Sequence, residues 1–213
     1  MPVTAQEIME EVRAAYASCA SYRDRGNVRT DFLRPSGELY MSTDRPFLTV
    51  FQRPDRFRYE YRDDDTCRRY VVWREGVAVR SRWDMMRAEQ REESLVLALA
   101  GATGVSGGSA HTVPSLLLPD EFEGNTVRQF VDVELVGEVT LDGVRCHHLT
   151  AAATHDSIDL WTAIDACLIR RIQRRFARGT FATASVTDYH PSVGINLGDD
   201  EFRFDGPGIA VVN

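Results

Sequence analysis

The sequence contains no lysine, and all 25 basic residues among its 213 are arginine. Schiff-base enzymes, pyridoxal enzymes, P-loop nucleotide enzymes and protein kinases each need a lysine amine at the reacting centre, so these classes are excluded. The 32 acidic residues outnumber the basic ones and give a formal charge of −7. Because no cluster of five or more basic residues offsets this charge, we expect no nucleic-acid partner.

Cysteine is scarce, and long apolar runs are missing. The four cysteines, at positions 19, 67, 146 and 167, form no C-x-x-C pair, which predicts free thiols packed as small apolar groups. The longest apolar stretch, Leu95–Val105, is far shorter than the roughly 20 residues that a membrane-spanning helix needs. A chain of this length buries enough surface to fold without a metal or a cofactor, and we expect neither.

The N-terminus reads Met-Pro-Val-Thr-Ala-Gln-Glu and lacks the basic and apolar regions of a signal peptide. As written, the chain is therefore expected in the cytoplasm, unless a leader has been removed. The first element is an amphipathic helix, because Thr4 and Glu7 have capping-box spacing and apolar residues then recur at helical intervals. The sequence 25–27, Arg-Gly-Asn, is predicted to end this helix.

Residues up to Trp83 alternate with a period of two, and turn residues recur every eight to twelve positions, as in an antiparallel meander. The turns are predicted at 35–37, 43–46, 53–55, 63–65 and 75–76. In Phe57–Arg62, three aromatic residues point one way and three charged residues the other, which predicts one covered face and one face in water.

A helical insert at about 87–120 interrupts the strands. Its pieces are expected at 87–101 and Val113–Leu118, separated by a glycine-rich connection. Strands resume at about Val127 and continue to Tyr189, with a turn at Asp142-Gly143 and a closing strand at 201–204. Roughly ten strands without βα alternation predict an antiparallel barrel or a strongly bent sheet in one domain, residues 1–213.

Two patterns contain the residue types of a catalytic or a metal site. Gly104–Gly108 matches the G-x-S-x-G form of a hydrolase nucleophile elbow around Ser106, but a helix rather than a buried strand precedes it. We therefore favour a flexible connection and keep a serine hydrolase as the third function. Cys146 and His148 would share a strand face, but zinc needs further ligands, for instance Cys167. A core or edge role is favoured for these residues.

Arginines interrupt the apolar strand Leu168–Phe176. A regular strand puts Arg170 and Arg174 on the same face as Ile172. Either a bulge turns them to solvent, which we favour, or one reaches the apolar side, where a guanidinium would suit an anionic head group. Both arginines are head-group candidates under the second interpretation.

The order of motifs resembles the LolA-like lipoprotein-carrier superfamily. The resemblance rests on a helix running into Tyr-Arg-Asp at 22–24, Phe-x-Arg-Pro-x-Arg-Phe-Arg at 51–58, Val-Val-Trp-Arg-Glu-Gly at 71–76, Leu-Trp-Thr-Ala-Ile-Asp at 160–165 and a closing Phe-Arg-Phe. It implies an antiparallel half-barrel around a helical plug or lid, with an apolar cavity for acyl chains. It also implies a place in the cell envelope and a signal peptide, which this sequence does not show.

The leading hypothesis is a non-enzymatic carrier of lipid acyl chains or of a lipidated protein, with an envelope protein as a further partner. A scaffold or sensor module with a packed sheet, acting through a protein surface, is the alternative. Each of the following positions could also be simple core. The expected cavity wall is Phe57, Tyr59, Tyr61, Val77, Val79, Val131, Val133, Leu135, Ile158 and Leu160, and the expected lid is Leu95, Leu99, Leu116 and Leu117.

Overall fold

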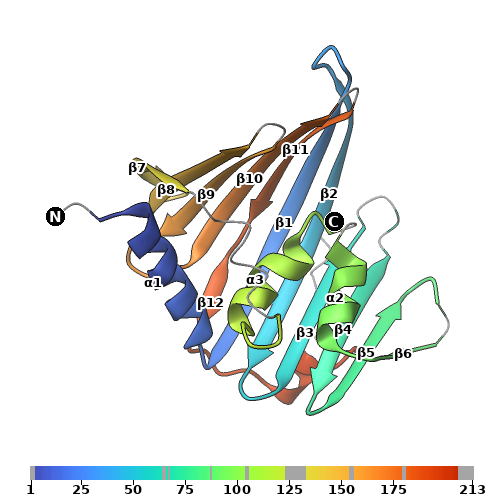
Figure 1. Ribbon diagram of the computed structural model, residues 1–213. Coiled ribbons are helices and arrows are strands. Elements are labelled where there is room, and N and C mark those ends of the chain that lie inside the picture. Colours follow the sequence, from blue (N-terminus) through green and yellow to red (C-terminus); the bar gives the residue numbers. More distant parts are fainter. Residues whose placement is uncertain are drawn as a thin grey trace.

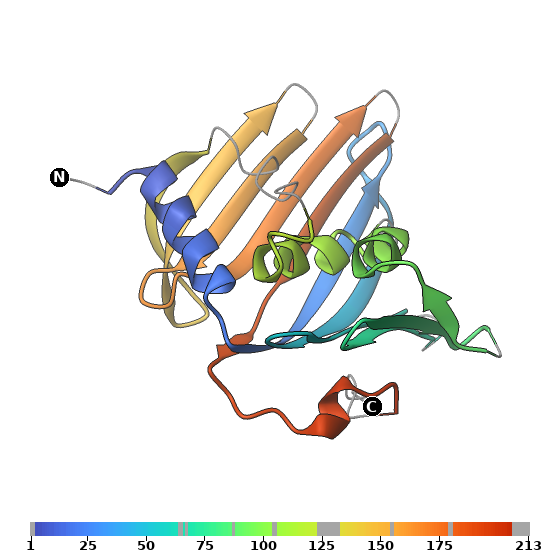
Figure 2. The same ribbon diagram turned by 60° about the horizontal axis from the view of Figure 1, so that its bottom comes forward.

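The computed structural model describes residues 3–63, 66, 68–86, 88–103, 106–122, 133–153, 156–178 and 181–205. Their strands form one open antiparallel sheet of twelve strands, which curves around helices on its concave side (Figure 1, Figure 2). The spatial order is β6-β5-β4-β3-β2-β1-β11-β10-β9-β8-β7, and β12 also pairs with β1. The expected architecture, a strongly curved antiparallel half-barrel around helices, is confirmed.

The bounds of the elements are as follows. The helices are α1 (Ala5–Ala17), α2 (Leu95–Thr103), α3 (Ser109–Leu117) and the 3-10 turn η2 (Asp199–Phe202). The strands are β1 (Ser21–Leu33), β2 (Leu39–Gln52), β3 (Arg56–Arg62), β4 (Arg69–Glu75), β5 (Ala78–Trp83), β6 (Gln90–Glu92), β7 (Glu134–Leu141), β8 (Val144–Ala153), β9 (Asp156–Ala163), β10 (Ile169–Arg178), β11 (Phe181–Asp188) and β12 (Pro191–Val193).

Helix α1 begins as the sequence predicts but ends earlier. Thr4 and Glu7 form the complete capping box, and the helix stops at Ala17. The predicted end at 25–27 is wrong, because these residues lie inside β1. Gly26 faces Phe47 on β2, and a Cβ at Gly26 would collide with the Phe47 ring, so this glycine makes room for an aromatic ring within the sheet.

Two further boundaries differ from the sequence prediction. The segment 43–46 is not a turn but part of the long strand β2. Pro46 fits there because the β2–β3 ladder begins only at Phe47, so β2 has a partner on one side alone at the proline. The closing segment is a 3-10 turn at η2 instead of a strand, and it lies on the outer side of the sheet (Figure 2).

Strand β3 corrects the expectation of one covered face and one face in water. Its aromatic residues are buried on the concave side, and Arg58 and Glu60 on the convex side are 0% exposed as well. The C-terminal segment, defined here as residues 195–205, covers that side, and its Leu197 and Phe202 form a second apolar cluster with Leu48 on β2. Because this segment covers the convex side, the alternation of aromatic and charged residues along β3 does not indicate a face in contact with solvent.

The insert has the predicted place but different limits. Residues 90–92 form the edge strand β6 rather than helix, and α2 begins only at Leu95. Helix α3 is longer than expected and contains Pro114, near its centre. The turns predicted at 35–37, 53–55 and 142–143 are confirmed, and the turn predicted at 75–76 lies one residue later, at 76–77. Two residues of the turn predicted at 63–65 fall outside the described residues. No helix within the described ranges is long and apolar enough to cross a bilayer.

Candidate ligand-binding face

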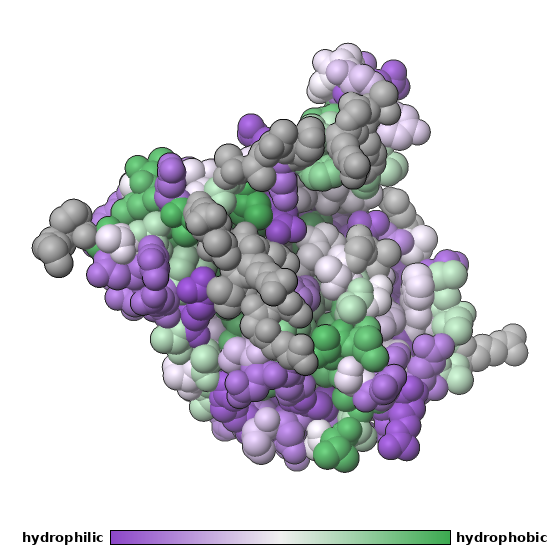
Figure 3. All heavy atoms as spheres, viewed as in Figure 1, coloured by the Kyte–Doolittle hydropathy of each residue, from purple (hydrophilic) through white to green (hydrophobic). Residues whose placement is uncertain are grey.

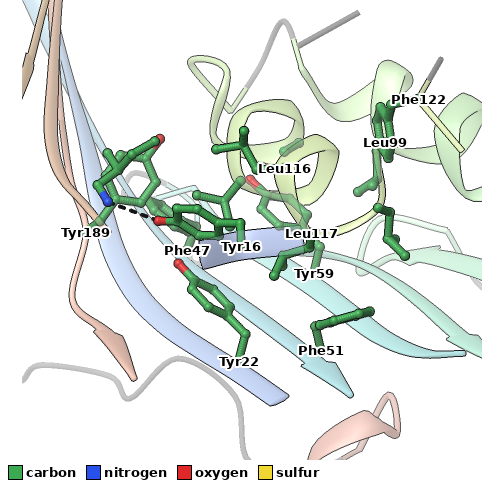
Figure 4. Close-up of a cluster of buried hydrophobic side chains, with 14 of the residues drawn as sticks. Tyr16, Tyr22, Phe47, Phe51, Tyr59, Leu99, Leu116, Leu117, Phe122 and Tyr189 are labelled. Atoms are coloured by element: carbon green, nitrogen blue, oxygen red, sulfur yellow. Dashed lines mark hydrogen bonds between the residues drawn. The ribbon is translucent and has the colours of Figure 1, made fainter. Parts of the chain in front are cut away.

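The concave face of the sheet and the inner side of the helices form one apolar layer. Aromatic residues of β3 and aliphatic residues of β9 belong to this layer. Figure 4 shows Tyr59 of β3 beside Leu117 of α3. Helices α2 and α3, called the insert below, cover the layer, and α1 closes its other side (Figure 1). Buried in it are the expected wall residues Phe57, Tyr59, Tyr61, Val79, Ile158 and Leu160 and the expected lid residues Leu95, Leu99, Leu116 and Leu117.

Three of the expected wall residues lie elsewhere or only partly in the layer. Val77 is fully exposed, because it occupies the tight turn between β4 and β5 and cannot line a cavity. Val133 and Leu135 are half-buried and pack against the layer from the start of β7. Val131 falls outside the described residues.

Few polar contacts fasten the insert to the sheet. The Tyr59 hydroxyl on β3 lies 2.7 Å from the Ser109 hydroxyl at the start of α3. The Arg53 guanidinium donates to the carbonyl of Leu117 at 3.1 Å, and the Tyr70 hydroxyl reaches the carbonyl of Ala98 at 3.4 Å. Most of the contact is apolar, so burial of apolar surface holds the insert in place.

A glycine fixes how closely the insert approaches the sheet. Gly107 precedes α3 with a φ of +61°, in the left-handed region that favours glycine. A Cβ at Gly107 would stand 2.5 Å from Cγ1 of Val28 on β1 and 3.5 Å from its Cβ. The turn into α3 is therefore pressed directly onto the sheet.

Helix α2 is apolar on more than the side that faces the sheet. Leu95, Ala98, Leu99 and Ala102 are buried against the sheet, whereas Leu97 on the other side is 56% exposed. A surface helix normally presents polar residues to water. This one leaves an apolar residue outside, and its exposed positions at Ala100 and Gly101 carry no charge.

Arg174 reaches the concave side. A bulge precedes Arg171 on β10, but Arg174 still pairs with Ile158 and lines a hollow with Tyr189 and the Gly107 turn. The favoured expectation, a bulge that turns the arginines to solvent, is thus wrong for Arg174. Burial lowers the pKa of His111 on α3, and the positive charge of Arg174 adds to this lowering. The hollow measures about 10 Å³, room for roughly one water molecule.

Strand β1 carries a buried carboxyl group that was not predicted from the sequence. Asp24 is 0% exposed and accepts hydrogen bonds from the His190 backbone N–H at 2.7 Å and the Tyr22 hydroxyl at 3.0 Å. Burial raises the pKa of Asp24 to about 7, although both bonds and the charge of Arg170 oppose the rise. Tyr22 and Asp24 are two residues apart and therefore share one face of β1. This spacing could have predicted the burial of Asp24, but the sequence prediction placed these residues in the first helix.

The residues weighed for chemistry have structural partners. Ser106 is buried, donates to the carbonyl of Thr103 at 3.4 Å and accepts from the Ala110 backbone N–H at 3.3 Å, so it serves the start of α3. Among the described ranges, no hydrogen bond joins Ser106 to a histidine or a carboxylate. The same ranges contain no group of histidine, cysteine and acidic residues that could hold a metal ion. Cys19, Cys146 and Cys167 are free thiols, as expected, and Cys67 falls outside the described residues.

Comparison with known proteins supplies a family and the fold. A family model described as "Predicted periplasmic protein (DUF2092)" matches residues 5–179. No curated protein sequence matches the chain. Among solved structures, an uncharacterized conserved protein from Thermus thermophilus is similar over 95% of this chain and 96% of its own, with 12% identity and a TM-score of 0.54.

Two further structures belong to named groups. A LolA superfamily protein from Nitrosomonas europaea matches over 96% of this chain and 99% of its own, with 14% identity and a TM-score of 0.42. The MucA/MucB complex structure from Pseudomonas aeruginosa matches over 97% of this chain and 64% of that chain, with 12% identity and a TM-score of 0.48. The first of these structures carries the name of the superfamily that the sequence motifs resemble, and both likenesses concern the fold alone.

Proposed function

Because the chain belongs to a family of predicted periplasmic proteins, DUF2092, we propose that it is a non-enzymatic binding protein of the cell envelope. Its ligand is a lipid acyl chain or the lipid of a lipidated protein, held between the concave face of the sheet and the insert. The observation that carries this proposal is an insert with apolar residues on both sides, Leu99 against the sheet and Leu97 in water, seated on an apolar sheet face.

In the described conformation the side chains of the insert occupy the face, so a ligand must displace them. Burying the four leucines of the lid contributes about 1.5–3 kcal/mol each, and a 16-carbon chain gains about 12 kcal/mol gross at about 0.8 kcal/mol per methylene. The two amounts are of similar size. Exchange of the insert for an acyl chain is therefore close to balanced, which suits a protein that must both take up and release its ligand.

Arg174 supplies the polar end of the proposed site. It stands beside the Gly107 turn with Ser185, Thr187 and Thr112, so hydrogen-bond donors surround the point where the insert meets β10 and β11. A guanidinium pairs well with a phosphate or carboxylate group. We place an anionic head group there and the acyl chain along the aromatic residues of β3.

A covalent clamp tests whether the insert must move. The Cβ positions of residue 107 and Val28 would lie 3.5 Å apart, at the short end of the range that disulfides span. The double variant Val28→Cys/Gly107→Cys, oxidised, should lose displacement of a fluorescent fatty acid, and reduction should restore it. The single variant Val28→Cys is the matched control, and it should bind in both redox states.

If the oxidised and the reduced double variant bind the fluorescent fatty acid equally well, the proposed binding mode is wrong. Native mass spectrometry of protein made in cells provides the independent measurement, with co-purifying species in the lipid mass range expected. Repeated observation of the bare protein, together with no fatty-acid binding in the reduced state, favours the alternative function. That alternative is a packed scaffold or sensor module that acts through a protein surface, and the filled concave face is the observation in its favour.

A further inference from the structure

The convex face of the sheet carries a second group of polar residues, separate from the proposed lipid site. Arg23 and Arg25 alternate along β1 and therefore point to the same side of the sheet. Strand β12 pairs antiparallel with β1, with Ser192 opposite Arg23 and Pro191 opposite Asp24. This register places His190 beside Arg25. The four side chains of Arg23, Arg25, His190 and Ser192 line a hollow of about 270 Å³.

The residues that line this hollow are basic or neutral. Two guanidinium groups, an imidazole and a hydroxyl line it, and no acidic residue does. Arg23 is held by Glu201 of the C-terminal segment, whose carboxylate lies 3.1 Å from one of its terminal nitrogens. Arg25 is exposed, and among the described ranges it has no hydrogen bond or ion pair. The hollow is thus faced by the guanidinium group of Arg23, which Glu201 holds in place, and by that of Arg25, which is open to a ligand.

Nearby acidic residues on the same face already have partners. Asp188, two residues before His190, pairs with Arg171, and Asp44 accepts a hydrogen bond from Asn27. The net charge of −7 repels anions at long range, but at about 0.1 M salt this field is screened beyond roughly 10 Å. The local arginines therefore decide what the hollow attracts.

The adjoining part of the face already binds carboxylates from the protein's own chain. Besides the Arg23–Glu201 pair, Arg56 lies 2.9 Å from Asp199 and stacks over the Phe202 ring. The C-terminal segment thus covers Arg56 and reaches Arg23, but it does not extend over Arg25. The hollow continues the same arginine surface where no segment within the described ranges occupies it.

We propose that this hollow is a binding site for a phosphate group, with Arg25 and Arg23 as its charged donors and Ser192 and His190 as further hydrogen-bond donors. Guanidinium groups present paired N–H donors that match phosphate oxygens, and a volume of about 270 Å³ leaves room for the small molecule or lipid head group that bears the phosphate. The site lies on the opposite side of the sheet from the proposed acyl-chain face and does not depend on it.

Titration of the full chain with inorganic phosphate and with glycerol 3-phosphate, followed by amide NMR shifts at constant ionic strength, tests the proposal. Saturable shifts are expected at residues 23–25 and 190–193. Arg25→Gln should weaken binding at least about tenfold. Arg29→Gln is the matched control, since Arg29 is exposed on the same face of the same strand but outside the hollow, and it should change binding less than about twofold.

Ser192→Asp, which puts a carboxylate into the hollow, should abolish binding without disturbing the core. Co-sedimentation with phosphatidic-acid vesicles against phosphatidylcholine vesicles identifies the source of the group. Binding to the acidic vesicles alone assigns a lipid head group, and saturable binding of the soluble phosphates assigns a free phosphate compound. The proposal is overturned if neither probe binds saturably, or if Arg29→Gln weakens binding as much as Arg25→Gln does.

Discussion

Arg58 and Glu60 form an ion pair in which both side chains are 0% exposed, with 2.5 Å between the guanidinium nitrogen and the carboxylate oxygen. The pair lies on the convex side of β3, and Arg58 also donates to the carbonyl of Glu201 at 3.3 Å. The C-terminal segment therefore does more than cover apolar residues. It removes a charged pair from water, and the pair in turn fixes the position of the segment.

Breaking this pair should be costly. Glu60→Gln leaves the Arg58 charge buried without its counter-charge, and we expect a loss of about 3–5 kcal/mol in the free energy of unfolding. The measurement is urea unfolding followed by circular dichroism. The control is Glu138→Gln, which breaks the exposed pair with Arg145 and should cost less than about 1 kcal/mol. Similar losses in the two variants would contradict the argument.

The buried carboxyl of Asp24 predicts an unusual pH dependence of stability. Because its pKa is raised to about 7 in the folded state, against about 3.9 in the unfolded chain, the folded state binds the extra proton between these values. Its contribution to stability is therefore fully present below about pH 4 and is lost as the pH rises through about 7, by a few kcal/mol in all.

Asp24→Asn tests this dependence, since the amide oxygen can still accept from the His190 N–H. The variant should be more stable than the parent protein at pH 8, and the difference should shrink as the pH falls toward 5. Melting temperatures measured across this range provide the check. Parallel pH profiles for the two proteins would show that Asp24 does not titrate as argued.

The contact between Gly107 and Val28 predicts a coupled pair of substitutions. Gly107→Ala adds a Cβ at 2.5 Å from Val28 and strains a φ of +61°, so we expect a loss of about 2–4 kcal/mol. Gly37→Ala is the matched control, because its φ is +83° but nothing lies within 4 Å, and it should lose only about 1 kcal/mol.

Adding Val28→Ala removes the atoms that the new methyl group meets. The losses of Gly107→Ala and Val28→Ala should consequently be less than additive in a double-mutant cycle, by about 0.5–3 kcal/mol. Unfolding free energies of the three variants and the parent measure this coupling. Strict additivity would mean that the turn before α3 does not press on β1.

Two valines that are close in sequence differ in their surroundings, since one lies in the core and the other in a turn. Val79 is 6% exposed on β5, and Val79→Ala should lower the free energy of unfolding by about 2 kcal/mol. Val77 is 100% exposed, so Val77→Ala should change stability by less than about 0.5 kcal/mol. Thermal unfolding of the pair distinguishes them, and equal effects would argue against the described turn.

Much of the architecture could be predicted from the sequence, because local chemistry determines it. The capping box at Thr4 and Glu7, the alternation of β3 and the glycine turns at Gly76 and Gly143 each depend on residues a few positions apart. Their period and turn types indicate an antiparallel sheet with helices on one side. The lid leucines Leu95 and Leu99 follow from the same reasoning, since an isolated apolar helix needs a sheet face to bury it.

What the sequence could not provide depends on partners far along the chain. The burial of Arg58 and Glu60 requires a segment some 140 residues away, Gly26 is explained only by the Phe47 ring on the next strand, and Arg23 and Arg25 acquire their hollow from β12. Periodicity reports which side of a strand a residue faces, but not what covers that side. Only the tertiary structure decides this, because the covering surface is chosen by long-range packing rather than by the residues nearby.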